Sequence, residues 1–161
     1  MDFNTCTVLA EATGLRAIAV YSHVLPAAIA IFLGFFTLVK TKASKLSVAF
    51  LFFTLAVAAW LIADAVLWAI PDYGRVAFFW SWIDFIDVIF FILAAYFFGI
   101  LARDSISPTE KFLLIALSVP SFLYTVTGNT VTGFDHSWCE MFNNDTAVLY
   151  KSFAEWAAIA S

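Results

Sequence analysis

Charged side chains are scarce in this sequence of 161 residues: they make up 12% of it, against 63% for hydrophobic residues. A soluble domain of this length has too little interior to bury so much apolar surface. The few charges gather in short polar segments at 40–45, 71–75 and 103–111, with long apolar runs between them. This spacing is typical of a protein that crosses a membrane several times, because each crossing helix needs roughly 20 apolar residues.

Basic tracts are also lacking, both within the sequence and among its first residues. The net charge is −4 and lysine and arginine form no cluster, which argues against nucleic acid as a partner. The first residues carry no basic segment of the kind that begins a secretory signal peptide. The apolar runs are too long for barrel strands, and lipid offers backbone groups no partners, so only helices can form them. The fold class is therefore predicted to be all-α.

The apolar runs predict a polytopic transmembrane helical bundle with four spans and the start of a fifth. We place the four spans at 17–39, 46–70, 76–101 and 112–130, and a polar loop after the fourth. The fifth apolar stretch begins near Ala147 and is too short to cross by Ser161, so we expect a chain that is truncated at its C-terminus. The regions are then an extracytoplasmic N-terminal segment at 1–16 and a transmembrane helical domain at 17–161.

The distribution of lysine and arginine predicts the orientation, because short cytoplasmic loops carry an excess of both. The loops after the first and third spans hold Lys40, Lys42, Lys45, Arg103 and Lys111, whereas the N-terminal segment and the other loops hold Arg16, Arg75 and Lys151. This bias predicts a multi-pass protein of a cell membrane with its N-terminus outside the cytoplasm. Cys6 and Cys139 then share the outer side, where we predict a disulfide between them, with two free thiols as the alternative.

Ionisable residues inside the apolar runs are the candidate ligand- or proton-binding residues: His23, Asp64, Asp84, Asp87 and, in the fifth stretch, Glu155. A charged side chain at the centre of a span costs roughly 2.5–3.5 kcal/mol on the insertion scale. Counting along each helix at about 1.5 Å per residue places four of them, one on each segment, at a similar depth in the outer half of the membrane, with Asp87 about one turn deeper than Asp84. Since Lys151 is assigned to a loop, no lysine or arginine is expected at that level.

Two tryptophans share helical faces with these carboxylates. Trp60 precedes Asp64 by four residues, and Trp80 precedes Asp84 by four, so each pair lies on one face of its helix. The short 71–75 connection makes these two spans antiparallel neighbours. We therefore expect His23, Asp64 and Asp84 to face one another and to share hydrogen bonds or protons, since no fixed cation balances them.

Three interpretations of this polar layer stay open. It can be a hydrogen-bonded core that orders the bundle, a tryptophan-lined pocket for protons or a small ligand, or a metal site of histidine and carboxylates. The sequence offers no metal-ligand spacing for the last of these. No catalytic motif is present, so no enzyme activity is expected, and the sequence does not indicate a cofactor.

The third predicted span resembles a known family. The segment 73–99, with Trp80-Ser81-Trp82 near its start and Tyr96-Phe97-Phe98-Gly99 at its end, is similar to the third helix of a seven-helix sensor region. That region lies at the N-terminus of some histidine kinases and diguanylate cyclases. Further similarities are found at Trp60, Val119-Pro120, Asn129, Gly133-Phe134 and 149–156. Asp84 and Asp87 depart from the pattern, because neutral residues or glycine are expected there.

The resemblance implies an integral membrane sensory domain that detects a small or lipophilic ligand, or protons. Its expected partners are the lipid bilayer and a C-terminal output module, which this sequence lacks along with the last helices. The alternative is a non-catalytic accessory subunit, whose partners would be other subunits of a larger membrane complex. A transporter or channel fragment is less well supported, because no convincing inverted repeat is present.

The predicted orientation can be tested by labelling a new cysteine at position 42. In a chain with Cys6→Ser and Cys139→Ser, the Lys42→Cys variant should resist a membrane-impermeant maleimide in intact cells and react after permeabilisation. The reason is that the lysine-bearing loop is predicted to face the cytoplasm. Strong labelling in intact cells would invert the predicted topology.

Overall fold

The computed structural model describes residues 20–67, 73–128, 131–135, 140–143 and 145–160. The chain begins this described part with a π-helical turn and is otherwise mostly α-helical, which confirms the predicted fold class. The elements in order are η2 (Val20–Val24), α3 (Leu25–Lys40), α4 (Lys45–Leu67), α5 (Tyr73–Arg103), α6 (Pro108–Thr127), β1 (Val131–Asp135), β2 (Glu140–Asn143) and α7 (Asp145–Ala160).

Within the described residues, four helices are long and apolar enough to cross a membrane: Tyr21–Lys40, Lys45–Leu67, Gly74–Arg103 and Pro108–Thr127. Each boundary lies within four residues of the predicted one, so the four-span prediction is confirmed. Helix α7 has 16 residues and is shorter than these spans. By length and composition, the four long helices are those of a multi-pass membrane protein.

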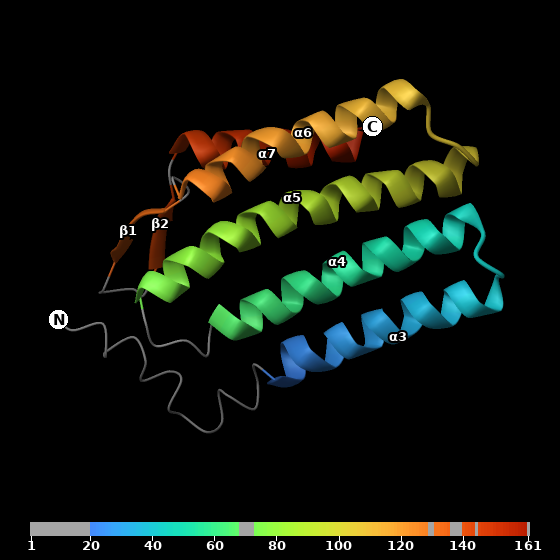
Figure 1. Ribbon diagram of the computed structural model, residues 1–161, viewed down its shortest axis with the longest axis horizontal. Coiled ribbons are helices and arrows are strands. Elements are labelled where there is room, and N and C mark those ends of the chain that lie inside the picture. Colours follow the sequence, from blue (N-terminus) through green and yellow to red (C-terminus); the bar gives the residue numbers. More distant parts are fainter. Residues whose placement is uncertain (1–19, 68–72, 129–130, 136–139, 144, 161) are drawn as a thin grey trace.

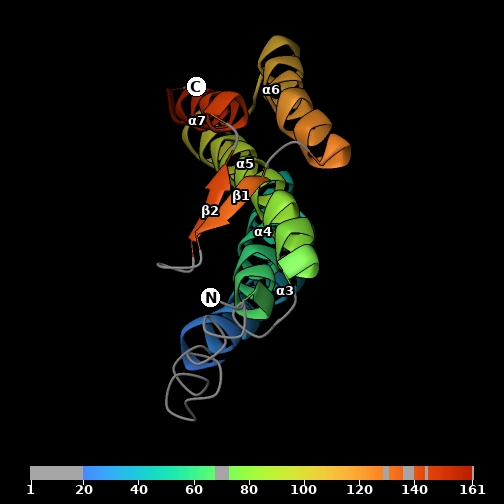
Figure 2. The same cartoon turned by 90° about the vertical axis from the view of Figure 1, so that its left-hand side faces the viewer.

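Helix α5 connects the two parts of the bundle. Helix α3 packs on α4 and α4 packs on α5, while α5 also contacts both α6 and α7. Figure 1 shows α3, α4 and α5 side by side, and the end-on view in Figure 2 shows them as a row. At the α5 end of that row, α6 and α7 lie on different sides and contact each other. The fold is thus a layer of three helices that ends in a three-helix cluster around α5.

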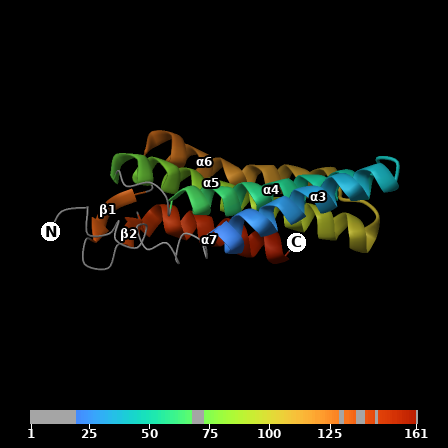
Figure 3. The ribbon, with the colours of Figure 1, turned by 90° about the horizontal axis from the view of Figure 1, so that it is seen from below.

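The bundle has two ends of different character, as Figures 1 and 3 show. The lysine end, which holds Lys40, Lys42, Lys45, Arg103 and Lys111, carries the α3–α4 and α5–α6 connections. The hairpin end carries strands β1 and β2. These strands pair antiparallel, with an irregularity in register between Val131 and Gly133. The hairpin is a correction to the sequence analysis, which predicted a loop here, because two such short strands give little periodic signal.

Local sequence sets the limits of α6. The Ser107 hydroxyl accepts a hydrogen bond from the Glu110 backbone N–H at 3.2 Å, and a Glu110 carboxylate oxygen accepts one from the Ser107 N–H at 2.8 Å. This reciprocal pair is a capping box. The other Glu110 oxygen accepts a 2.6 Å bond from Arg103, which ties the end of α5 to the start of α6. Gly128 ends the helix with a positive φ of 69°, a conformation that suits glycine.

Gly34 determines how closely α3 approaches α4. A Cβ atom at this position would collide with the Thr54 hydroxyl and lie 2.9 Å from the Leu51 side chain. The Thr54 hydroxyl is held in place, because it donates a 2.9 Å hydrogen bond to the Leu51 carbonyl. Small residues at such contacts let membrane helices gain van der Waals packing. Gly34 is therefore needed for the observed α3–α4 distance.

We expect a Gly34→Val variant to lose roughly 1–3 kcal/mol of unfolding free energy, the usual cost of overpacking. The free energy of unfolding can be measured by steric trapping in bilayer discs. An Ala28→Val variant serves as the control, since Ala28 is exposed on the same helix and has room for the larger side chain. Equal stability of the two variants would contradict a close α3–α4 contact at Gly34.

Candidate functional site

Lys151 of α7 lies between two carboxylates of α5. Its Nζ atom is 3.0 Å from Asp84 Oδ1 and 2.8 Å from Asp87 Oδ2. Glu155, one turn further along α7, has its Oε1 atom 3.9 Å from the same Nζ. These four side chains, called the Lys151 cluster below, are between 12% and 26% exposed. One ammonium group thus meets three carboxylates in a largely buried place.

The spacing along each helix brings the cluster together. Asp84 and Asp87 are three residues apart on α5, and Lys151 and Glu155 are four apart on α7, so each pair shares a helical face. Further along the same two helices the contact becomes apolar. Its buried members are Val88 and Ile92 of α5, Ala154 and Ala158 of α7, and Leu114 of α6. The Lys151 cluster therefore lies next to this apolar core, on the side nearer the hairpin end.

Negative charge exceeds positive charge in the Lys151 cluster. An ammonium group has three donors, and two of the carboxylates lie within hydrogen-bonding distance of it. The Glu155 Oε1 atom is buried and accepts no hydrogen bond from the residues that the structure describes. Asp87 and Glu155 are also close enough to repel each other when both are ionised. A proton or small cation bound by Glu155 would relieve both unfavourable terms.

A second polar site joins the first span to the second. His23 Nε2 lies 2.8 Å from Asp64 Oδ2, and the two side chains are 20% and 27% exposed. The other ring nitrogen, Nδ1, lies 2.7 Å from the Ser22 hydroxyl. When the ring is neutral, Nε2–H donates to the carboxylate and Nδ1 accepts from Ser22. When the ring is protonated, the contact with Asp64 becomes a charged pair and strengthens.

The backbone around His23 is irregular. His23 lies in the π-helical turn η2, and Pro26 follows within the first two residues of α3. Proline lacks the N–H that would bond the carbonyl four residues before it, which for Pro26 is that of Ser22. Single π-helical turns are rare and are frequent at functional sites. The His23–Asp64 pair therefore stands where the first span departs from regular α-helix.

The structure divides the predicted layer of His23, Asp64 and Asp84 into two sites. His23 and Asp64 are paired, as expected. Asp84 instead pairs with Lys151 across the α5–α7 contact. The prediction that no lysine lies at this level is wrong, because α7 begins at Asp145 and carries Lys151 inside the helix. A full positive charge is a stronger partner for a carboxylate than a shared proton or a neutral ring.

Lys151 is the residue that the sequence analysis missed, and one signal could have found it. Lys151 and Glu155 stand four apart within an apolar stretch, which is the spacing of an ion pair on one helical face. Trp60 and Trp80 lie half-buried on α4 and α5, on the same helical faces as Asp64 and Asp84. The predicted disulfide stays a prediction, because Cys6 and Cys139 lie outside the described residues.

The described part of the chain contains no set of side chains that would support the metal interpretation. Within those residues, no three histidine, cysteine, aspartate or glutamate side chains are grouped as a metal ion would require. The polar-core and proton- or ligand-pocket interpretations both remain compatible with the two sites. They differ in whether the Lys151 cluster changes its protonation or its bound ion during function.

Comparison with known proteins assigns no family. No family model, no curated protein and no solved structure matches this chain. The function must therefore be argued from the geometry and charge of the sites themselves.

We expect a Lys151→Met variant to lose roughly 1–3 kcal/mol of unfolding free energy, because three partly buried carboxylates lose their cation. The loss should stay below that of a fully buried pair, since Lys151 is 26% exposed. Steric trapping in bilayer discs measures this loss. Adding Asp84→Asn and Asp87→Asn to the variant should restore part of it, because the unpaired charges are then removed.

The matched control is Lys111→Met, which removes an exposed lysine of α6 that has no ion pair among the described residues. It should leave stability unchanged. Equal losses in the two variants, or no recovery in the triple variant, would contradict a structural role for the Lys151 pairs.

Proposed function

We propose that this protein is an integral membrane sensory protein in which protons or a small cationic ligand act on the Lys151 cluster. The observation that carries the proposal is the imbalance of charge there. Three carboxylates surround one ammonium at the contact between α5 and α7, and the buried Glu155 Oε1 atom accepts no hydrogen bond from the described residues. Unbalanced negative charge in a largely buried place is what a proton or cation would bind.

The cluster supports a two-state response. A ligand shifts a conformational equilibrium only by its difference in affinity for the two states. A proton that neutralises Asp84 removes the charge that pairs with Lys151 across the α5–α7 contact. Loss of this ion pair favours the state in which α7 is released from α5. Glu155, which has the weakest contact with Lys151, would take up the first proton with the least disturbance.

The other helix contacts differ from this one and support α7 as the mobile element. The α4–α5 contact is built of stacked rings, with Phe53 centred 5.5 Å from Phe90 and 5.8 Å from Phe97. Such contacts do not depend on protonation. Loss of charge in the Lys151 cluster would thus loosen the α5–α7 contact and leave the α4–α5 contact unchanged.

The resemblance of segment 73–99 to the third helix of a sensor region is a second support. In such a protein, displacement of α7 would be the change that an output module reads. The accessory-subunit alternative gives the Lys151 cluster a purely structural role, in which the α5–α7 contact holds at every pH. The two functions therefore differ in a measurable way.

The proposal predicts that acidification lengthens the distance between α5 and α7. Spin labels at Phe78→Cys on α5 and Leu149→Cys on α7 use two exposed positions, in a chain with Cys6→Ser and Cys139→Ser. Pulsed electron resonance in bilayer discs should report longer distances at about pH 5 than at about pH 8, because added protons neutralise carboxylates that pair with Lys151.

Two variants control this measurement. Asp84→Asn with Asp87→Asn should give the long-distance population at every pH, because Lys151 has then lost both close carboxylates. Asp104→Asn removes a carboxylate outside the Lys151 cluster and should leave the response of the parent chain intact. Identical distances at both pH values in the parent chain would refute the sensory proposal and favour the accessory subunit.

A further inference from the structure

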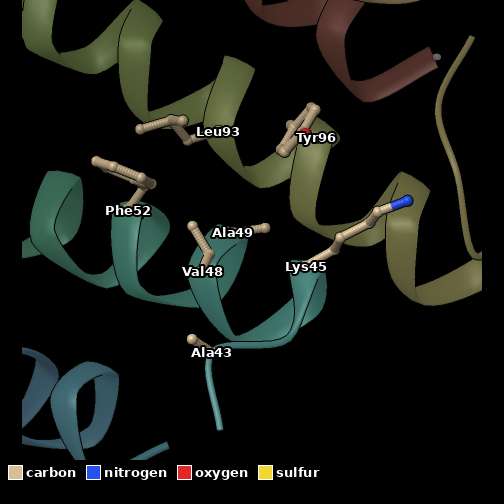
Figure 4. A pocket seen from close by; sticks show the side chains of 7 residues that line it. All are labelled: Ala43, Lys45, Val48, Ala49, Phe52, Leu93 and Tyr96. Atoms are coloured by element: carbon tan, nitrogen blue, oxygen red, sulfur yellow. The ribbon is translucent and has the colours of Figure 1, made fainter. Parts of the chain in front are cut away.

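A groove lies along the α4–α5 contact at the lysine end, away from both polar sites. Its volume is about 320 Å³. Its walls are apolar and come from Val48, Ala49 and Phe52 of α4 and Leu93 of α5. Figure 4 shows Lys45 and Tyr96 at one end of this groove, with Phe52 and Leu93 at the other. The groove therefore has one polar end and one apolar end.

The helical geometry makes the groove long and narrow. Lys45, Val48 and Phe52 are spaced three and four residues apart, so they line one face of α4. The seven residue steps from Lys45 to Phe52 correspond to about 10 Å along the helix axis. Phe52 is 54% exposed, so the groove opens on the outer surface of a helix that is apolar enough to span a membrane. Lipid chains are the surroundings expected on such a surface.

Positive charge is in excess around the polar end. The described basic residues at the lysine end are Lys40, Lys42, Lys45, Arg103 and Lys111, against two carboxylates, Asp104 and Glu110. Glu110 is already bonded to Arg103 at 2.6 Å. Lys45 has no ion-pair partner within the described ranges and lies at the exposed start of α4. An anion at the mouth of the groove would meet an unneutralised lysine.

We propose that this groove binds one anionic phospholipid, with its phosphate at Lys45 and the upper part of an acyl chain along Val48, Phe52 and Leu93. The Tyr96 phenol stands beside Lys45 and offers an amphipathic wall where headgroup and chain meet. Basic pockets between membrane helices take acidic lipid headgroups in this way. The apolar walls favour a lipid over a soluble phosphate. The site is independent of the sensory function proposed for the Lys151 cluster.

The site can be tested by photocrosslinking in bilayer discs. The probe is phosphatidylglycerol with a diazirine in its acyl chain, and peptide mass spectrometry locates the adducts. Adducts are expected within 45–52 and 93–96. Unlabelled phosphatidylglycerol should suppress them, whereas phosphatidylcholine and soluble glycerol phosphate should not.

Three variants give the groove its own controls. Lys45→Gln should lower the yield of groove adducts about five-fold, the factor that corresponds to ~1 kcal/mol for one lysine near an anionic lipid. Lys111→Gln makes the same charge change at the same end but outside the groove, and should leave the yield unchanged. Val48→Trp fills the groove and should displace the adducts while Lys45 remains.

Three results would overturn the proposal. Equal competition by phosphatidylcholine would indicate a site without headgroup selectivity. Loss of adducts with glycerol phosphate alone would indicate a soluble phosphate site. An equal effect of Lys45→Gln and Lys111→Gln would indicate a diffuse positive surface, with no specific role for the groove. Because Lys45 is exposed at a helix start, the Lys45→Gln comparison holds even if Val48→Trp fails to fold.

Discussion

The cost of placing an ionised side chain among apolar groups shapes this molecule more than any other constraint. The close ion pairs of the described spans join residues of different helices, so they lie at the contacts between helices. Lys151 joins α7 to α5 through Asp84 and Asp87, and His23 joins the first span to α4 through Asp64. The charged groups are few, and those that are present hold the bundle together at defined places.

Helix α5 is the element on which these contacts converge. On one side it stacks phenylalanines against α4, and on the other it packs against α6 and α7. The α4–α5 contact is apolar and insensitive to pH, while the α5–α7 contact combines an apolar core with the Lys151 cluster. One helix thus joins a layer held by apolar contacts to a neighbour that is held partly by ion pairs. The proposed movement of α7 on α5 rests on this difference.

The two ends of the bundle suit different partners. The polar sites lie toward the hairpin end, where carboxylates outnumber cations within the Lys151 cluster. The lysine end has an excess of basic residues and a groove with a lysine at its mouth. A cation is favoured at the first place and an anion at the second. Because charged groups at opposite ends of a spanning helix interact weakly across that distance, the charges at one place have little effect on the other.

Hydropathy alone was enough to locate the four long helices, because a chain in lipid can satisfy its backbone only within helices. Depth counting also brought His23 and Asp64 together, since it needs only the boundaries of the spans. The β1–β2 hairpin was missed, because its short strands are stabilised by pairing with each other and show little periodicity.

The place of α7 was decided by tertiary structure. Asp84 could have faced α4 or α7, and the spacing of residues along α5 cannot distinguish the two neighbours. The close fit of Ala154 and Ala158 against Val88 and Ile92 sets α7 beside α5 and carries Lys151 to the two aspartates. The sequence by itself determined which segments are helical and which residues are costly in lipid. Only packing decided which of those residues meet, because side-chain shape selects helix neighbours and hydrophobic periodicity does not.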